Sequence, residues 1–396
     1  MKAVILAAGE GVRLRPFTSS RPKVMIPVAN RPILEYVVQA LVENGIRDIV
    51  MVVGYRRERI MSHFGDGSGY DARINYAVQE KQLGTAHALL AAKGMAGKEF
   101  LVLAGDNVVD AKFVSDLIGV EDGSAISVAQ SEMASKYGVV SLDGDKVTNI
   151  VEKPTSTQER VVSTGAYRLN SSVFELLEKE ASRGVMSLTH VLGSNLRKLD
   201  MRAVRTSGKW MDVVYPWDLL KVNAAAMTWA GLSIEGTVED DVILKGPVAI
   251  GAGSRIRSGC YIEGPVVIGQ GCDIGPLVTI QPSTSIGDAV VVGPYTHIFE
   301  SVIMGGASIG SHSHISHSVM DEGTSVGPGF MAPGTTANVR VENEFFGLKR
   351  IGTLVGESSV IGAGVTCVSG TIIGAESKVA DHATIRGTLE NRSIVI

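Results

Sequence analysis

The sequence has few cysteines, few aromatic residues and no excess of positive charge. Its 396 residues include three cysteines, 5% aromatic residues and a formal net charge of -4. Cys260, Cys272 and Cys367 are too few and too scattered for a disulfide framework or a zinc site, so we expect them to be small buried residues. Because the chain offers no basic field to a nucleic-acid backbone, the expected partners are small molecules and copies of the chain itself.

Long hydrophobic runs are also missing. No stretch approaches the length of a membrane span, and the apolar run at 3–8 is too short for a signal peptide. We therefore expect a cytoplasmic protein. A chain of 396 residues is too long for one ordinary core, so we expect two domains.

The first half, up to about residue 228, alternates short aliphatic runs with amphipathic segments. This pattern is typical of βαβ units and predicts an α/β domain built on a parallel sheet. The expected strands are 3–8, 49–53, 74–78 and 100–107, and the expected helices are 33–44, 56–64 and 85–93.

A glycine turn follows the first expected strand. Gly9 and Gly11 would let backbone amides approach phosphate oxygens, while Arg13 and Lys23 supply positive charge. The spacing fits neither the dinucleotide fingerprint nor the P-loop, so an ordinary tight turn is the alternative. Asp106, at the end of the expected strand at 100–107, is either a turn former or a magnesium ligand at the same edge of the sheet.

Several motifs resemble those of the sugar-1-phosphate nucleotidyltransferases, in particular the glucose-1-phosphate thymidylyl- and uridylyltransferase branch. Residues 6–16 (LAAGEGVRLRP) and 21–36 (RPKVMIPVANRPILEY) resemble the family signature very closely. Residues 103–107 (LAGDN) resemble the metal-binding LxGD motif, and 209–223 resemble a WxDxGxPxDLLxAN segment in which Val214 replaces the glycine. The resemblance implies a Rossmann-like nucleotidyltransferase domain over 1–228 that uses Mg²⁺.

The same resemblance implies roles for individual residues. Arg13 and Lys23 would act on the triphosphate as catalytic cations, Asp106 and Asp212 would bind Mg²⁺, and Asp218 would cap the following helix. Residues 79–89 (QEKQLGTAHAL) resemble a segment that reads a pyrimidine, which favours UTP or dTTP. The implied nucleotide-binding residues are Ala8, Gly9, Gly11, Gln79, Gly84 and Thr85.

The sugar side is implied by two further motifs. Residues 136–140 (KYGVV) and 150–154 (IVEKP) resemble segments in which Gly138 lets the sugar approach, Glu152 binds its hydroxyls and Lys153 neutralises its phosphate. Ser163 stands where acetylglucosamine-specific members often have asparagine. The sugar 1-phosphate is therefore expected to be that of glucose or N-acetylglucosamine.

The second half repeats with a period of six residues. An aliphatic residue occupies every sixth position from Ile250 to Ile298, and the spacing resumes at Ile309 and again from Val355 to Ile385. A short fixed period predicts a triangular solenoid of very short parallel strands with glycines at its corners. Resemblance to hexapeptide-repeat proteins implies a left-handed parallel β-helix over 234–396, a fold that commonly forms homotrimers. The period is broken at about 334–352, which should loop outward.

Chain-wide, this domain order resembles the bifunctional N-acetylglucosamine-1-phosphate uridylyltransferase and glucosamine-1-phosphate acetyltransferase family, especially its archaeal type. Residues 314–317 (HISH) resemble the acetyltransferase motif, which implies His314 as general base, and 335–338 (TTAN) imply Asn338 at the acceptor, with acetyl-CoA as a possible co-substrate. Gln281 stands where these enzymes usually hold an arginine for the sugar phosphate, and Arg340, Lys349 or Arg350 could substitute. The histidines at 312, 314 and 317 have two other interpretations, a metal site or exposed positions on a rung of the solenoid.

Three classes of function follow from the sequence. The first is an enzyme with two activities, nucleotidyl transfer and acetyl transfer. The second is a nucleotidyltransferase whose β-helix only trimerises the protein. The third is a non-catalytic regulatory subunit, which has no need of Arg13, Lys23 and Asp106.

Overall fold

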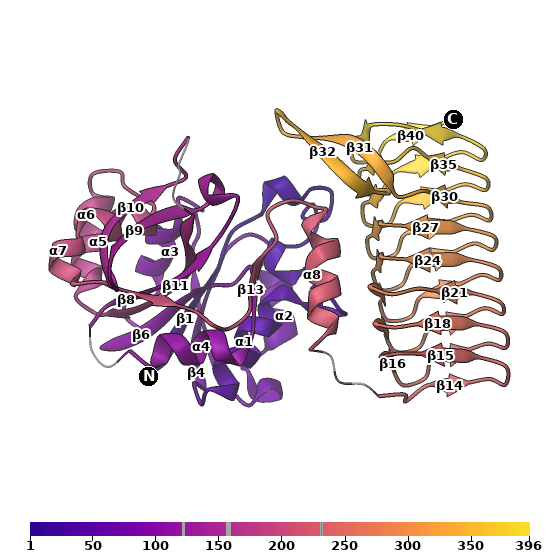
Figure 1. Cartoon of the computed structure of the whole chain (residues 1–396). Coiled ribbons are helices and arrows are strands. Elements are labelled where there is room, and N and C mark those ends of the chain that lie inside the picture. Colours follow the sequence, from indigo (N-terminus) through magenta and orange to yellow (C-terminus); the bar gives the residue numbers. More distant parts are fainter. Residues whose placement is uncertain (121–122, 156–159, 230, 232) are drawn as a thin grey trace. The chain divides into compact units, whose positions relative to one another are not determined.

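The structure, a computed structural model, describes residues 1–120, 123–155, 160–229, 231 and 233–396 (Figure 1). It divides into two compact units. The first contains Met1–Glu10 and Ile33–Asp212, and the second contains Gly11–Pro32 and Val213–Ile396. The functional domains 1–228 and 234–396 stay a prediction, because packing units and functional domains need not share their bounds.

The first unit is built on a mixed nine-stranded sheet in the order β5-β4-β1-β6-β11-β8-β12-β10-β9. Strands β5, β4, β1 and β6 run parallel, and β1 and β4 are almost continuously buried, as expected for strands covered on both faces. The strands are β1 (Lys2–Ala7), β4 (Asp48–Val53), β5 (Arg73–Val78), β6 (Glu99–Ala104), β8 (Ala125–Gln130), β9 (Gly138–Asp143), β10 (Lys146–Glu152), β11 (Val161–Asn170) and β12 (Arg202–Arg205).

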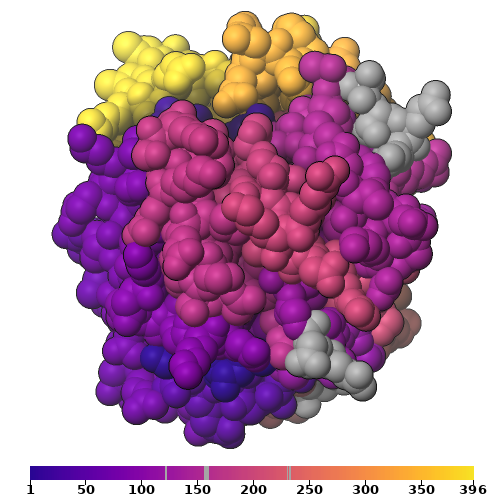
Figure 2. Space-filling model, turned by 90° about the vertical axis from the view of Figure 1, so that its left-hand side faces the viewer, coloured from indigo at the N-terminus to yellow at the C-terminus, as the bar shows by residue number. Residues whose placement is uncertain are grey.

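Helices pack their apolar faces against this sheet. They are α1 (Ile33–Glu43), α2 (Arg57–Phe64), α3 (Thr85–Ala91), α4 (Ala111–Ile118), α5 (Val173–Ala181), α6 (Leu188–Ser194) and α7 (Leu196–Leu199). Figure 2 shows the face of the first unit on which the rose-coloured segment carrying α5 to α7 reaches the surface. The predicted α/β fold is confirmed, and every predicted helix and strand of this half except the strand at 100–107 is found within about two residues of its expected bounds.

One boundary differs in a way that matters for the site. The strand expected over 100–107 ends at Ala104, and a short strand, β7 (Asn107–Val109), follows it. Gly105 and Asp106 therefore form the link between two strands. Strand β7 pairs with β13 (Trp210–Asp212) rather than with the main sheet.

The second unit is a left-handed parallel β-helix with three faces, which confirms the predicted solenoid (Figure 1). Its period-six aliphatics, such as Ile256, Ile274 and Ile298, are buried in one continuous core. Cys260, Cys272 and Cys367 are buried free thiols, as predicted.

Each face of the β-helix is one parallel sheet. The first consists of β14 (Thr237–Val238), β17 (Arg255–Ile256), β20 (Asp273–Ile274), β23 (Val291–Val292), β26 (Ser308–Ile309), β29 (Ser325–Val326), β34 (Val360–Ile361), β37 (Lys378–Val379) and β40 (Ile394–Val395). The second consists of β15 (Ile243–Lys245), β18 (Tyr261–Glu263), β21 (Thr279–Ile280), β24 (His297–Phe299), β27 (His314–Ser316), β30 (Met331–Ala332), β35 (Thr366–Cys367) and β38 (Thr384–Ile385). The third consists of β16 (Val248–Ile250), β19 (Val266–Ile268), β22 (Thr284–Ile286), β25 (Val302–Ile303), β28 (Val319–Met320), β33 (Leu354–Val355), β36 (Ile372–Ile373) and β39 (Thr388–Leu389).

The prediction that glycines form the corners is wrong in part. Several corners hold residues with side chains in the left-handed region, among them Ser283 (φ 63°), Glu300 (φ 44°) and His317 (φ 49°). These three occupy the same corner of successive coils, because Glu300 N donates to Pro282 O and His317 N donates to Phe299 O. Non-glycine corners place a column of polar side chains along one edge of the helix.

Three further elements complete the second unit. The predicted excursion at 334–352 is an antiparallel hairpin of β31 (Thr335–Val341) and β32 (Glu344–Ile351). Helix α8 (Asp218–Met227) packs on β22 and β25. Segment 11–32 holds two single 3-10 turns, Val12–Leu14 and Lys23–Met25, and the strand pair β2 (Pro27–Val28) and β3 (Arg31–Pro32). Throughout the described residues, no helix is long and apolar enough to cross a membrane.

Candidate active site

The side chain of Lys23 packs against the backbone of the glycine turn at Gly11. Gly11 has a φ of 80°, and a Cβ added there would lie 2.7 Å from the Cβ of Lys23, so only glycine fits. Arg13 and Lys23 stand on the two 3-10 turns of this segment. Arg13 Nε lies 3.6 Å from Glu342 Oε2 on the β31–β32 turn, but both side chains are about half exposed, so this pair contributes little.

Gly9 and Asp106 follow neighbouring parallel strands of the first unit. Leu6 pairs with Ala104 in the β1–β6 ladder, and Gly105 N donates to Leu6 O at 2.9 Å. Both residues therefore extend from the carboxyl edge of the sheet, where open α/β sheets bind ligands. Ala8 is buried just before the turn, and its carbonyl accepts a hydrogen bond from Tyr55 N.

Asp212 is brought beside Asp106 by strand pairing. In the β7–β13 ladder, Asp212 stands opposite Asn107, the residue after Asp106. The buried Asn107 side chain donates to Thr164 O at 2.8 Å and so ties β7 to β11. Asp106 and Asp212 are both partly exposed.

The segment expected to read the base is held by its own contacts. The Gln79 amide nitrogen donates to Gly84 O at 3.0 Å and lies 2.9 Å from His87 Nδ1. A Cβ on Gly84 would clash with Met186 O, so internal packing already requires this glycine. Thr85 Oγ1 accepts from Leu188 N at 2.9 Å. The roles of these residues toward a nucleotide stay a prediction.

The residues expected to bind the sugar lie together on β9, β10 and β11. Gly138 pairs with Glu152, and a Cβ on Gly138 would lie 3.3 Å from Glu152 Oε2 and 3.8 Å from Ser163 Cβ. Lys153 has a φ of 42°, a strained conformation for a residue with a side chain, and its N–H donates to Tyr137 O. The strand ends thus gather a carboxylate, a hydroxyl and a lysine around a glycine.

In the second unit, His314 lies within an aromatic cluster on the second face of the β-helix. It is paired with His297 in the β24–β27 ladder, and its ring centroid lies 5.1 Å from that of His297 and 6.0 Å from that of Phe299. His297 Nε2 lies 3.0 Å from Gln281 Oε1. Burial lowers the pKa of His314 below its usual value, so the imidazole is neutral at neutral pH.

His317 is buried, so its interpretation as an exposed position is wrong. Its Nε2 lies 2.7 Å from Glu300 Oε2, and its Nδ1 lies 3.1 Å from Ser316 Oγ. Burial lowers the pKa of His317 and Glu300 opposes that shift. Glu300 comes from the same corner of the preceding coil.

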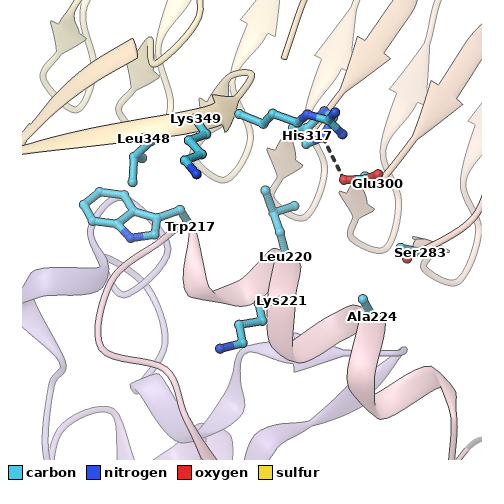
Figure 3. Close-up of a pocket in the computed structure, with 10 residues that line it drawn as sticks. Trp217, Leu220, Lys221, Ala224, Ser283, Glu300, His317, Leu348 and Lys349 are labelled. Atoms are coloured by element: carbon cyan, nitrogen blue, oxygen red, sulfur yellow. Dashed lines mark ion pairs between the residues drawn. The ribbon is translucent and has the colours of Figure 1, made fainter. Parts of the chain in front are cut away.

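A cavity of about 370 Å³ opens beside this pair (Figure 3). Its cationic lining comes from Lys221 on α8 and from Lys349 and Arg350 on β32, and its apolar lining includes Trp217 and Leu348. Three cations stand against the single carboxylate of Glu300, so the cavity favours an anion with an apolar portion. Asn338 is exposed on β31 opposite Gly347, on the same hairpin as Lys349.

Comparison with known proteins places the first half in a family. The family model for nucleotidyl transferases matches residues 2–228. The chain belongs to the nucleotidyl transferase family. Beyond this nucleotidyl transferase region, the model of the GMPPB C-terminal domain matches residues 262–346.

Individual relatives extend the likeness. A bifunctional sugar-1-phosphate nucleotidylyltransferase/acetyltransferase of Sulfurisphaera tokodaii is 32% identical over 398 residues, covering 97% of each chain. The bifunctional protein GlmU of Methanococcus maripaludis is 37% identical over 65% of this chain, and the chain spans only 62% of that relative's length. A Bacillus anthracis protein assigned as a glucose-1-phosphate thymidylyltransferase, crystallised with a sucrose, aligns with a TM-score of 0.53 and 27% identity over 57% of this nucleotidyl transferase and 95% of its own chain.

Sequence reasoning missed two residues that lie against those expected to bind the sugar. Tyr167 is buried, and its hydroxyl lies 3.1 Å from Ser163 Oγ. Burial raises the pKa of Tyr167, so it stays a neutral hydroxyl beside Glu152. Thr189 Cγ2 would lie 2.7 Å from a Cβ on Gly138. Tyr167 could have been found, since alternation along β11 puts it on the same face as Ser163, whereas Thr189 comes from a helix with no motif.

Proposed function

We propose that this nucleotidyl transferase moves a nucleotidyl group from UTP or dTTP to glucose 1-phosphate or N-acetylglucosamine 1-phosphate and releases pyrophosphate. The observation that carries the proposal is the shared sheet edge. The Gly9 turn and Asp106 follow adjacent parallel strands, and Asp212 is in register with the residue after Asp106. The sugar-side residues Gly138 and Glu152 belong to the same unit.

The chemistry needs no protein nucleophile, because a sugar-phosphate oxygen attacks the α-phosphorus in line while pyrophosphate leaves. The obstacle is repulsion, since two unit like charges at about 4 Å cost about 4 kcal/mol at an effective dielectric near 20. In this proposal Arg13 and Lys23 hold the triphosphate and Lys153 holds the sugar phosphate. Positioning and charge stabilisation supply most of such catalysis.

The donor set suits Mg²⁺. Asp106 immediately precedes β7, and Asp212 lies on β13, the strand that pairs with β7. In the part of the chain that the structure describes, no group of three or more His, Cys, Asp or Glu side chains could hold a metal. Mg²⁺ typically takes one or two carboxylates and completes its shell with phosphate oxygens and water. When bound, the ion would neutralise charge on the reacting phosphates.

The test is pyrophosphate release across a grid of four nucleoside triphosphates and several sugar 1-phosphates. We expect release with UTP or dTTP and with glucose 1-phosphate or N-acetylglucosamine 1-phosphate, and much less with purine nucleotides. Release with ATP or GTP alone would overturn the pyrimidine assignment. No release with any pair would overturn nucleotidyl transfer itself.

The second unit supports a second activity, acetyl transfer from acetyl-CoA to the amine of glucosamine 1-phosphate. His314 would act as general base, and Lys221, Lys349 and Arg350 would supply the positive charge that Gln281 cannot give to the acceptor phosphate. The specific observation is the cationic cavity one corner away from the His314 cluster. A trimer through the β-helix could complete this site, and Asn338 on the hairpin would contact the acceptor.

Replacing His314 by Ala should lower acetyl transfer by about 10²- to 10⁴-fold and leave pyrophosphate release unchanged, since general bases contribute on this scale. Because burial lowers the His314 pKa below 6.5, the neutral base persists to a lower pH, and the wild-type rate should fall only below about pH 6.5. The assay follows the free coenzyme A thiol, with His312→Ala as the matched control.

If wild-type protein releases no thiol with glucosamine 1-phosphate or related amino-sugar phosphates, the β-helix is structural. The protein is then a nucleotidyltransferase with one activity. If it also lacks pyrophosphate release, it is a regulatory subunit.

A further inference from the structure

Segment 11–32 leaves the first unit and packs within the second. It carries Arg13 and Lys23, yet its own secondary structure is limited to two single turns and a pair of two-residue strands. A segment with so few internal hydrogen bonds is weakly restrained by itself. Its position is therefore set by its contacts with the rest of the second unit, which are the bond from Ala29 N to Asn223 Oδ1 on α8 and a series of contacts with the β-helix.

The most buried of these contacts is an ion pair at Arg21. The Arg21 side chain is only 4% exposed, and its Nη2 lies 2.7 Å from Asp321 Oδ1. Its Nη1 lies 2.9 Å from Glu322 Oε1. Asp321 is fully buried at the end of β28, and Glu322 N also donates to Asp321 Oδ1 at 2.8 Å. The guanidinium fork thus joins two neighbouring carboxylates in a fixed orientation.

Other polar contacts extend this anchoring along one edge of the β-helix. Ser20 Oγ donates to Glu357 Oε2, and Asn391 Nδ2 donates to Ser19 Oγ at 3.2 Å. Asn30 Nδ2 donates to Ile286 O at 2.6 Å. The β-helix partners in these bonds lie at or just after the ends of strands of the third face, each on a different coil. The bonds of Ser19, Ser20 and Asn30 are part-buried or exposed, and each involves at least one neutral group. Among the contacts described here, the Arg21 contact is therefore the buried charge pair.

We infer that Arg21, held by Asp321 and Glu322 of the β-helix, is a positioning residue for nucleotidyl transfer that fixes Arg13 and Lys23 where they meet the triphosphate. The inference rests on the proposed function. It gives the β-helix a part in the first reaction, whatever its own activity. Misplacement of a positioning group by about 1 Å can cost about 10²-fold in rate.

The ion pair also predicts a pH dependence. Burial raises the pKa of Asp321 to about 7, although Arg21 opposes the shift, and the other charged groups that act on it are Glu322 and Glu357. As pH falls through about 7, Asp321 takes up a proton and loses the charge that holds Arg21. We therefore expect the KM for the nucleotide to rise between about pH 8 and about pH 6.

The effect of Asp321 on folding has the opposite sign. Its pKa in the folded protein, about 7, lies above the usual value of 3.8, so the folded state binds the proton first as pH falls. Between these values the unfolded state binds fewer protons, and the free energy of unfolding contributed by Asp321 increases on acidification. If acidification raises the KM for the nucleotide while the melting temperature stays the same or rises, the cause is misplacement of segment 11–32. Loss of the fold would instead lower the melting temperature.

The experiment uses full-length Arg21→Met and Asp321→Asn proteins and measures pyrophosphate release with nucleotide and sugar phosphate varied in turn. We expect the KM for the nucleotide to rise about 10- to 100-fold, with a smaller change for the sugar phosphate. Asp321→Asn should also abolish the pH dependence of that KM, and Arg21→Lys should restore part of the wild-type affinity. The matched control is Arg257→Met, which breaks the Arg257–Asp273 pair on the β-helix surface and should change nothing.

Two measurements keep the result clear. Thermal unfolding identifies a variant that fails to fold, and if Arg21→Met does, the nearly isosteric Asp321→Asn decides. Limited proteolysis with trypsin after Arg13 reports release of the segment without any assay of activity, and we expect faster cleavage in Arg21→Met. A folded Asp321→Asn with wild-type KM, pH profile and cleavage rate overturns the inference. Faster cleavage in a protein with no nucleotidyl transfer would overturn the proposed function alone.

Discussion

Replacing Asp106 by Asn is expected to lower pyrophosphate release by about 10³-fold while the protein stays folded. A bound divalent ion supplies several kcal/mol of charge stabilisation, and about 4 kcal/mol corresponds to about 10³ in rate. Asp106 lies in the link between β6 and β7 with a partly exposed side chain, so an amide of the same size leaves no hole in the core. The measurement is kcat for pyrophosphate release at saturating Mg²⁺, nucleotide and sugar phosphate.

The partner carboxylate makes this prediction specific. Asp212→Asn should give a similar loss, and the double variant should lose little more, because two ligands of one ion act as a unit. Direct titration of Mg²⁺ in the presence of nucleotide should show weaker binding in both variants. Asp143→Asn, an exposed change of the same kind at the end of β9, is the control and should be silent. Fully additive losses would mean that Asp106 and Asp212 do not share an ion.

Much of the fold could be predicted because its signals are periodic. An aliphatic residue at every sixth position can be buried only if the chain turns at a fixed interval, and Ile256, Ile274 and Ile298 do stack in one core. The strands of the first unit were equally clear, since runs such as 49–53 are apolar throughout and central parallel strands are covered on both faces.

Contacts between residues that are distant in the sequence and belong to no common motif could not be predicted. Glu300 and His317 are one coil apart, and the break in the period at Glu300 hides the fact that both occupy the same corner. Likewise, nothing near Arg21 indicates that its partners are Asp321 and Glu322. A buried charge of either sign is visible in a sequence only as a polar residue, and its partner is known only once the chain has folded.

In the candidate site, too, residues in motifs could be predicted, whereas residues that reach the site through packing could not. Gly9, Asp106 and Glu152 lie in motifs, and the ladders β1–β6 and β9–β10 account for where the backbone places them. Tyr167 and Thr189 contact the sugar-side residues through packing alone. Gly84 shows that a motif glycine can have a structural cause, since Met186 O occupies the space that a side chain would need.

Lys23→Ala is expected to lower pyrophosphate release by about 10²- to 10³-fold, by analogy with the loss of one oxyanion donor. Lys23 begins the second 3-10 turn, where the left-handed Gly11 lets its Cβ approach the glycine turn. Burial raises the pKa of the half-buried Asp218, while its N–H bonds from Val214 and Tyr215 and the positive charge of Lys23 oppose that shift. We predicted that Asp218 would cap the N-terminus of α8. Instead, its carboxylate binds the backbone of the turn that precedes the helix.

A control must show whether the rate depends on the positive charge of Lys23 itself or on the total positive charge of segment 11–32. Arg15→Ala removes one exposed cation from the same stretch, between the two 3-10 turns, and should change the rate little. Lys23→Arg keeps the charge but replaces a compact ammonium by a larger fork, so it should recover only part of the rate. Because a triphosphate is held by several cations, Lys23→Ala should depress kcat more than it raises the KM for the nucleotide if Lys23 acts chiefly on charge that develops in the transition state. If Lys23→Ala and Arg15→Ala lower the rate equally, Lys23 contributes only a general attraction for an anion. The contact between Lys23 and Gly11 would then have only a structural role in this segment.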